Sequence, residues 1–350
     1  MIDLSSSAHQ GVRLRAIAGG LLLLLGAACS NSNGGTGPTE VALPGDSTAT
    51  SGAAPVDSTT ILSPTDSFGI TGAVAALDTR SPRPGIVFAT DGMQNQYFSS
   101  VYTGSKRGGG VTPDNVLSLL SDARSKGARV VLKLTMGADS YIQNSDRTFS
   151  FTKWKALVDR FKAVNLGPYI ADGTLLGHFL IDEPHRAAKW GGKIIPQSTV
   201  EAMAKYSKQI WPTMNTFVHT QMTWLASSPI TYTYLDAGWQ QYATSKGAVT
   251  SWITGEISSA KSKGLGLMVG MNVLDGGNGS SGIRGTSSGL YSMSATELKT
   301  YGTVLLNQSY ACGFIIWQHN LTYFGRSDVK SAMATLSNMA KLHVKTACRQ

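Results

Sequence analysis

The sequence predicts an α/β fold, a (β/α)8 barrel of the TIM type, from three observations. Apolar segments of strand length alternate with amphipathic segments of helix length from about residue 67 onward. The apolar segments are nearly continuous, which is typical of parallel strands that helices bury on both faces. The connections after the expected helices are short, whereas most connections after the expected strands are long. Long loops at the carboxyl ends of parallel strands are the loops from which such barrels build active sites.

The expected elements follow from this alternation. Strands are expected at 71–77, 85–90, 129–135, 177–182, 215–220, 231–236, 265–271 and 312–318. Helices are expected at 113–126, 151–164, 198–210, 249–263, 294–309 and 327–343. The first helix has Thr112 as a cap before Pro113, and proline is favoured at the first helical position. Helices are missing between the first and second strands and between the fifth and sixth, so we expect a barrel that is irregular at its first two strands. A doubly wound sheet is the alternative, but it rarely needs eight strands.

The N-terminus has the features of an export signal. Arg13 and Arg15 precede an apolar run of about thirteen residues, which is too short to span a bilayer but suits a secretory signal. Cys29 follows "LGAA" and resembles the lipidated cysteine of the bacterial lipoprotein lipobox, although Gly26 stands where that family usually has leucine. The resemblance implies a signal peptide at 1–28 and a lipid anchor at the bacterial outer membrane or cell surface. A plain secretory signal cut nearby is the alternative, and either way the protein is exported.

The remainder of the chain divides in two. Residues 29–66 are rich in Ser, Thr, Gly and Pro and contain no Lys or Arg, so we expect a disordered tether before a folded domain at 67–350. The chain has 30 basic and 21 acidic residues. The first 66 residues hold two of the basic and five of the acidic residues, so the expected domain has 28 basic and 16 acidic residues. This excess suits an acidic partner, such as a uronic polymer or nucleic acid. Many lysines fall on helical segments as solvated faces, however, and we expect no nucleic acid, no membrane contact beyond the anchor, and a monomer.

The ends of the expected strands carry the candidate site. In a barrel these residues face one mouth. They are rich in carboxylates for acid–base work on a glycosidic bond, in amides and imidazoles for hydroxyl groups, and in indoles for sugar faces. We therefore expect a carbohydrate substrate at Asp91, Lys133, Asp182, Glu183, His219, Gln221, Asp236, Trp239, Asn272, Asp275, Trp317, Gln318 and His319. Lys133 lies inside an apolar strand and needs a carboxylate partner, which we expect to be Asp91 or Glu183.

Two short motifs resemble a known group of enzymes. The stretch "FLIDEP" (179–184) resembles the end of the fourth strand in the large clan of retaining (β/α)8 glycosidases, where the Glu before Pro is the general acid/base. Trp317, in "FIIWQ", is similar to the tryptophan that those enzymes place under the bound sugar. The resemblance implies that Glu183 is the general acid/base, and Pro184 is expected to bias Glu183 toward an extended conformation.

The sequence also departs from that clan. Asp182 replaces an Asn that binds a sugar hydroxyl, and the seventh strand, in 265–277, contains no Glu to act as nucleophile. We expect Asp275 or Asp236 to substitute as a catalytic carboxylate, or an inverting enzyme in which a carboxylate activates water. A weaker resemblance is to chitinase-type barrels, whose fourth strand ends in Asp-x-Glu and whose substrate supplies its own nucleophile, but the spacing differs.

Three functions therefore stay open. The leading one is a glycoside hydrolase that acts on a poly- or oligosaccharide with Glu183 as general acid/base. A non-catalytic carbohydrate-binding surface lipoprotein on a degenerate barrel would explain the missing Glu. A metal-dependent hydrolase that uses Asp91, Asp182, His185 or His219 ranks third, because no tight ligand motif occurs. The sequence also has no Walker loop, and we expect no metal and no cofactor.

Two cysteines are expected to form a disulfide. Cys312 opens the last expected strand, at the bottom of the barrel. Cys348 follows the final expected helix, which returns from the mouth to the same end. Exported proteins mature in oxidising compartments, where such neighbours pair.

Overall fold

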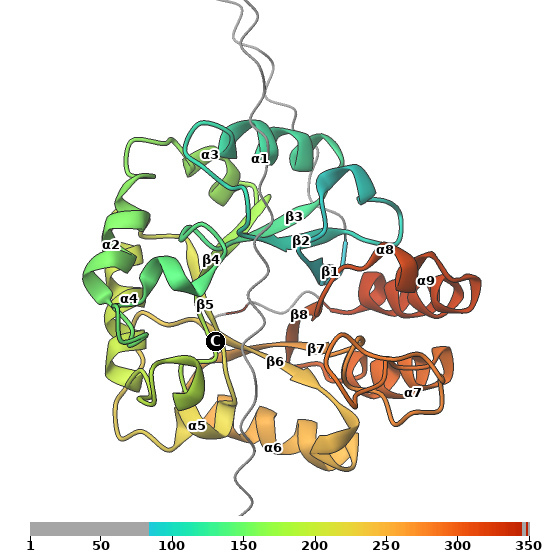
Figure 1. Ribbon diagram of the computed structural model, residues 1–350. Helices are drawn as coiled ribbons and strands as arrows, with labels where there is room; N and C mark the ends of the chain where they lie inside the picture. Colours follow the sequence, from blue (N-terminus) through green and yellow to red (C-terminus); the bar gives the residue numbers. More distant parts are fainter. Residues whose placement is uncertain (1–83, 345–347, 349–350) are drawn as a thin grey trace, which may run out of the picture. The chain divides into compact units, whose positions relative to one another are not determined.

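The predicted (β/α)8 barrel is confirmed. The computed structural model describes residues 84–344 and Cys348, all within the compact unit Thr71–Gln350. Eight parallel strands close a barrel in chain order, and β1 pairs with β8 through Val87 opposite Gly313 (Figure 1). The strands are β1 Val87–Asp91, β2 Gly104–Arg107, β3 Arg129–Leu132, β4 Leu175–Asp182, β5 Asn215–His219, β6 Ala237–Tyr242, β7 Gly266–Met271 and β8 Ala311–Ile316.

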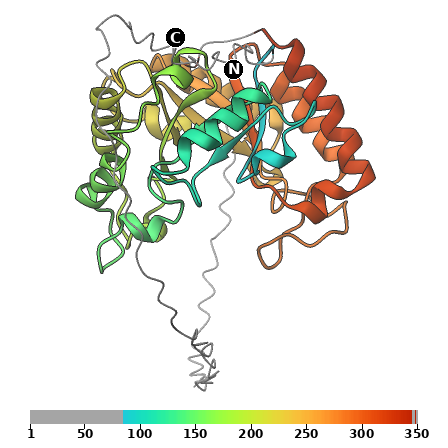
Figure 2. The same ribbon diagram turned by 90° about the horizontal axis from the view of Figure 1, so that it is seen from above.

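Helices surround the strands, as Figures 1 and 2 show. The α-helices are α1 Val116–Ser125, α2 Phe151–Asp159, α3 Gly167–Ala171, α4 Gln197–Ile210, α5 Met222–Ala226, α6 Val249–Ser262, α7 Ala295–Leu306, α8 Leu321–Gly325 and α9 Ser327–Leu342. The 3-10 helices are η1 Asn95–Tyr97, η2 Asp139–Ile142, η3 Ala187–Lys189 and η4 Thr244–Lys246. All six expected helices are present as α1, α2, α4, α6, α7 and α9. None of the described helices is long and apolar enough to cross a membrane.

The start of α7 shows how the sequence sets a helix boundary. The Ser294 side chain accepts a hydrogen bond from the backbone N–H of Glu297, and the Glu297 carboxylate accepts one from the backbone N–H of Ser294. This capping box satisfies two N–H groups that the first turn leaves free. It therefore ends the long β7–α7 loop at a defined residue.

Strand β2 was not expected. The predicted strand at 71–77 lies outside the described residues, and the ring is completed by β2, from a segment expected to be a loop. Its sequence, GSKR, has no apolar run. It can still form a strand because neighbouring elements make hydrogen bonds with its polar side chains. Ser105 Oγ donates to Thr90 O at 3.0 Å, and Arg107 Nη1 donates to Asn95 Oδ1 at 3.2 Å. Long-range hydrogen bonds thus support a strand that hydrophobicity does not reveal.

The position of the sixth strand also differs. Residues 231–236 were expected as a strand, but they form an irregular segment and β6 begins directly after them. The Glu201 carboxylate, on α4, accepts hydrogen bonds from the backbone N–H groups of Thr233, Tyr234 and Leu235 at 2.7, 2.8 and 3.0 Å. These N–H groups therefore bond to a side chain rather than to a strand, and a tertiary contact overrides the local β-propensity. Asp236 consequently lies at the amino end of β6.

Side chains fill the inside of the barrel. Val87, Val131, Phe179, Trp239 and Met268 belong to one buried cluster contributed by strands around the ring. The larger cluster lies in the layer that includes the helices. The barrel is thus a packed core rather than a pore, and a ligand site is restricted to its rim.

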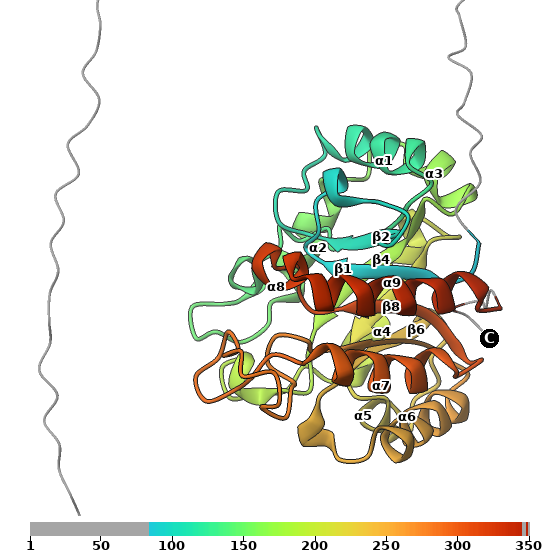
Figure 3. The same cartoon turned by 90° about the vertical axis from the view of Figure 1, so that its right-hand side faces the viewer.

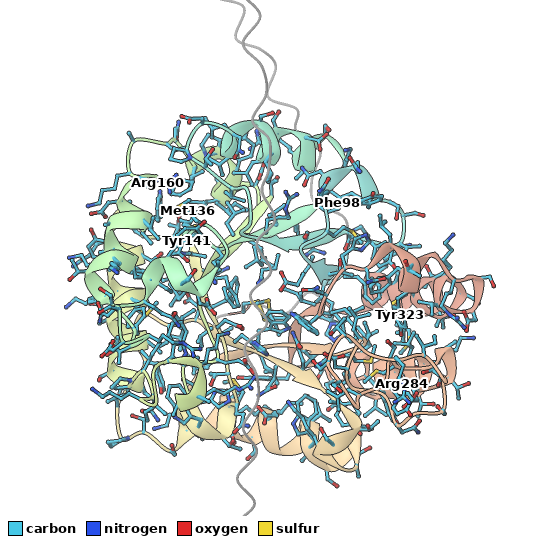
Figure 4. The ribbon with its side chains drawn as sticks, in the orientation of Figure 1. Phe98, Met136, Tyr141, Arg160, Arg284 and Tyr323 are labelled. Carbon is cyan, nitrogen blue, oxygen red and sulfur yellow. A yellow bond between two sulfur atoms is a disulfide. The ribbon has the colours of Figure 1, made fainter. Side chains whose placement is uncertain are left out.

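One end of the barrel carries the long loops. Figure 3 shows the long loop between β7 and α7 at the same end as α8. In the view of Figure 4, Met136 and Tyr141 of the β3–α2 loop lie on one side of the barrel, whereas Arg284 and Tyr323 lie on the other. The end of the barrel that carries the β7–α7 loop and α8 is called the mouth, and the carboxyl ends of the strands lie there.

The disulfide between Cys312 and Cys348 is present, with the two Cα atoms 5.1 Å apart. Cys312 lies at the start of β8, and both residues are buried. Replacing both with serine is expected to lower the free energy of unfolding by about 3–4 kcal/mol, because the bridge closes a long loop in the unfolded chain. Denaturant titration of the protein with its disulfide intact measures the loss. Reduced wild type should match the double variant, and an unchanged free energy would contradict the prediction.

Candidate active site

Glu183 directly follows β4 at the mouth. Its backbone N–H donates to His219 O at 2.8 Å, and its carbonyl accepts from Trp190 Nε1 at 3.1 Å. The extended conformation expected from Pro184 is wrong, since the φ angle of Glu183 is +48°, in the left-handed region. A non-glycine residue there costs about 1–3 kcal/mol and persists only where its surroundings fix it, a condition often met at active sites.

Arg186 holds the Glu183 carboxylate. Its Nη1 donates to Oε1 at 3.0 Å and to Oε2 at 2.7 Å. The arginine side chain is 58% exposed, whereas that of Glu183 is 23% exposed. An ion pair with so much solvent around one partner is typically worth about 0–1 kcal/mol. Arg186 can therefore leave Glu183 at little cost.

Beside Glu183, Asp182 joins a chain of alternating charges. His219 Nδ1 lies 2.6 Å from Asp182 Oδ1, and Lys189 donates to Asp182 Oδ2. Lys189 also lies 2.9 Å from Asp139 Oδ2 and 3.8 Å from Glu183 Oε2. Burial raises the pKa of Asp182, but the hydrogen bond from His219 and the charges of His219 and Lys189 hold it well below its usual value. Asp182 is therefore an anion at ordinary pH.

Lys133 has a different partner from those predicted. Its Nζ donates to Asp139 Oδ1 at 2.6 Å and to Gly137 O at 2.6 Å. Burial lowers the pKa of Lys133, while Asp139 raises it. Asp139 belongs to η2, beyond the end of β3, so the β3–α2 loop folds back over the lysine. The predicted pairing with Asp91 or Glu183 is wrong.

Asp91 pairs with a lysine that the sequence did not single out. Lys106 Nζ, from β2, lies 2.9 Å from Asp91 Oδ2. The same ammonium lies 4.5 Å from the ring centroid of Phe179 and 5.7 Å from that of Trp239. Lys106 was missed because β2 was missed.

Two cavities occupy the mouth and share a wall. The wall consists of Glu183, Arg186, His219, Gln241 and Asn272. The lysine cavity, about 390 Å³, adds His185, Gln221, Gln240, Ala243 and Lys246. The tryptophan cavity, about 360 Å³, adds Asp91, Asp182, Asp275, Ser287, Leu290 and Trp317. Each is within the volume range of small-ligand sites.

Two predicted carboxylates are not available to substrate. Asp236 is 0% exposed and lies at the amino end of β6, where it bonds to Lys208 Nζ at 2.6 Å and Thr216 N at 2.8 Å. The predicted position of Asp236 at the mouth is therefore wrong. Asp275 does line the tryptophan cavity, but it accepts four hydrogen bonds from the backbone and hydroxyl groups of Thr286 and Ser287. Burial raises its pKa and these bonds lower it, with a lowered net value. Asp275 thus holds the β7–α7 loop.

The predicted aromatic residues separate by depth. Trp239 is 1% exposed, donates from Nε1 to Ile315 O at 3.1 Å, and packs 4.6 Å from His219, between ring centroids. Stacking of a sugar on Trp239 is therefore wrong, since its ring is covered. Trp317 is half-buried and faces the tryptophan cavity. It is the predicted indole that a sugar can reach.

The remaining predicted residues divide likewise. Gln221 and Asn272 line the cavities. Gln318 is exposed and lines neither of the two cavities. His319 packs between Tyr97 and Phe324, at 5.1 and 5.6 Å between ring centroids, and burial lowers its pKa. His319 is thus part of an aromatic stack beside the site.

The sequence did not single out Lys189, Gln240, Gln241 or Lys246, all of which lie in or beside the mouth. Gln240 and Gln241 belong to β6, whose position was predicted six residues too early. Lys246 could have been found from the sequence, because it closely follows the polar residues Gln240 and Gln241 at the carboxyl end of that strand. Within residues 84–344 and Cys348, no group of three or more His, Cys, Asp or Glu side chains is placed to hold a metal ion.

No protein-family model and no curated protein matches this chain. Solved structures with a similar fold include a GH113 β-1,4-mannanase, at 10% identity and a TM-score of 0.46 over 74% of this chain and 99% of that one. The catalytic domain of the major endoglucanase of Xanthomonas campestris pv. campestris is 13% identical, with a TM-score of 0.47 over 75% of this chain and 98% of that one. A GH10 xylanase from termite gut is 11% identical, with a TM-score of 0.48 over 76% of this chain and 78% of that one. The likeness is one of fold, and it identifies no specific family.

Proposed function

We propose that this protein is a glycoside hydrolase acting on a poly- or oligosaccharide, with Glu183 as general acid/base. The observation that carries the proposal is the position of Glu183 in the wall between the two cavities. Among the residues of that wall, it is the one carboxylate. A sugar chain that spans both cavities would place a glycosidic bond over Glu183.

Proton donation fits the surroundings of Glu183. As a general acid/base, the carboxyl group must reach the leaving oxygen and exchange a proton with it. Because Arg186 is mostly exposed, an incoming substrate can displace it. The neighbouring Asp182 remains charged, held by Lys189 and His219, and supplies negative potential where positive charge develops on the sugar ring.

The second carboxylate is best assigned to Asp91. With Asp236 at the other end of the barrel and Asp275 occupied by the β7–α7 loop, Asp91 and Asp182 are the remaining carboxylates that line the tryptophan cavity with Glu183. Asp182 contacts both Lys189 and His219, whereas Asp91 contacts one cation, Lys106, among the described residues. An oxygen of Asp91 therefore remains for water or for the sugar.

One observation favours the second candidate, a carbohydrate-binding protein without catalysis. The resembled clan carries its nucleophile, a Glu, on the seventh strand. Strand β7 and the loop after it hold no Glu, and their one carboxylate is Asp275. Incubating wild type and Glu183→Gln with a panel of polysaccharides distinguishes the two functions. New reducing ends from wild type alone support the hydrolase, whereas glycan binding without products from either protein supports the binding protein.

We also propose that the protein is exported and lipidated at Cys29, which lies outside the described residues. The apolar run before "LGAAC" supports this proposal. Fatty-acid labelling in a lipoprotein-producing bacterium should mark the wild type and not Cys29→Ser. Absence of label from both proteins would reject the lipid anchor and leave a secreted protein.

A further inference from the structure

The two cavities at the mouth differ in charge. The tryptophan cavity is lined by Asp91, Asp182 and Asp275 in addition to Glu183. In the lysine cavity Glu183 is the one carboxylate, and Arg186 already pairs with it. That leaves Lys246 as a cation without a carboxylate partner in the cavity, so this half of the mouth carries excess positive charge.

Lys246 is held in place by neutral groups. Its Nζ donates to Gln240 Oε1 at 2.7 Å and to Gln241 O at 2.5 Å, and it lies 4.9 Å from the ring centroid of Trp252. Within residues 84–344 no carboxylate lies within ion-pairing distance of this ammonium. An ammonium has three N–H donors, so one remains for a ligand. The lysine is exposed as a residue, but hydrogen bonds to Gln240 and Gln241 anchor its ammonium.

A second donor, Gln241, lies in the wall that the two cavities share. Gln241 is 6% exposed, lines both cavities, and its Nε2 has no hydrogen-bond acceptor among the described residues. A buried amide donor without an acceptor is costly. If the Gln241 amide turned toward the cavity, a ligand oxygen could accept a hydrogen bond from Nε2. That hydrogen bond would remove the cost.

Taking these observations together, we propose that the lysine cavity recognises an anionic group on the sugar, a uronate carboxylate or a sulfate ester, through Lys246 and Gln241. The inference rests on the proposed function for the position of the scissile bond, but the binding it describes does not require hydrolysis. A neutral sugar would displace water from Lys246 without supplying a counter-charge, whereas an anionic group would form a charge-assisted hydrogen bond with it.

The test measures binding to a Glu183→Gln, Arg186→Gln double variant, so that neither hydrolysis nor the arginine that Glu183→Gln alone would leave unpaired interferes. The probes are matched polymers: polygalacturonate, glucuronoxylan and alginate against their carboxyl-reduced forms, and a sulfated galactan against its desulfated form. We expect at least one acidic polymer to bind about 10–100-fold more tightly than its neutral match. Carboxyl reduction and desulfation then separate the uronate from the sulfate.

Substitutions at Lys246 assign the effect to the cavity. Lys246→Met should remove the preference for the acidic polymer, and Lys246→Arg should retain it. Lys261→Met, near the end of α6, is the matched control and should leave binding unchanged. Circular dichroism checks that each variant is folded.

The pH dependence adds a readout that a structural role would not move. Burial lowers the pKa of Lys246 to about 8, while Glu256 and Glu183 raise it. Binding of the acidic polymer should therefore weaken as pH rises through this value, because the lysine loses its charge. In the double variant the other titratable side chains that line the cavity are His219 and His185, and burial lowers the pKa of His185. With Lys246→Arg the step near pH 8 should disappear, since arginine remains charged.

The outcomes separate the inference from the proposed function. Equal binding of acidic and neutral forms, binding of neither, or a preference that survives Lys246→Met overturns the inference. If wild type hydrolyses neutral glycans and acidic polymers bind no more tightly than their neutral matches, the inference fails and the hydrolase stands. If acidic polymers bind through Lys246 but wild type releases no products, the inference stands and the hydrolase fails.

Discussion

Glu183→Gln should lower turnover on the natural glycan by about 10²–10⁴-fold, the usual contribution of a positioned general acid. Glutamine matches the shape of the side chain and can bind sugar hydroxyls, but it cannot donate a proton to a leaving oxygen. The carboxylate is half-buried at the strand end, and its substitution removes the exposed pair with Arg186 and a longer contact with Lys189, at 3.8 Å. Folding and glycan binding should therefore remain.

Substrates with different leaving groups test the role of the proton. A sugar with an activated leaving group, such as a nitrophenyl group, needs little protonation, so the step that expels it should be nearly unaffected in Glu183→Gln. Steady-state rates on both substrate types, with thermal unfolding as a control for folding, measure this difference. Full turnover of the variant on the natural glycan would exclude Glu183 as general acid.

Asp236→Ala should lower the free energy of unfolding by about 3–5 kcal/mol, the cost of breaking a buried ion pair by removing one partner. Asp236 is fully buried, and Lys208, 13% exposed, lies 2.6 Å from its Oδ2. The same oxygen accepts hydrogen bonds from Thr216 N at 2.8 Å and Thr216 Oγ1 at 3.2 Å. The substitution leaves all of these groups without that acceptor.

Denaturant unfolding measures this loss, and a double variant provides the control. Removing Lys208 as well should cost less than the sum of the two single changes, because the unpaired charge is then absent. The folded fraction of Asp236→Ala should retain its turnover. A variant that is as stable as wild type but catalytically inactive would instead restore Asp236 to the catalytic role predicted from the sequence.

The two carboxylates show what sequence reasoning can and cannot reach. Glu183 was placed correctly at the mouth because β4 is a long apolar run that ends at "DEP", and a parallel strand must end at the mouth. Asp236 was placed at the wrong end because 231–236 has strand-like residues. Only the folded chain brings Glu201 to their N–H groups and moves the strand to 237–242.

The sequence by itself determined the barrel, six of its helices, the positions of β1, β3, β4, β5, β7 and β8, and the disulfide partners. These features depend on burial and order along the chain, which periodicity records. The tertiary structure alone decided the polar strand β2, the register of β6, the pairing of Lys133 with Asp139, and the position of Lys246 in a cavity without a carboxylate partner. Each of these depends on a contact between residues from different elements, and such a contact leaves no periodic pattern in the sequence.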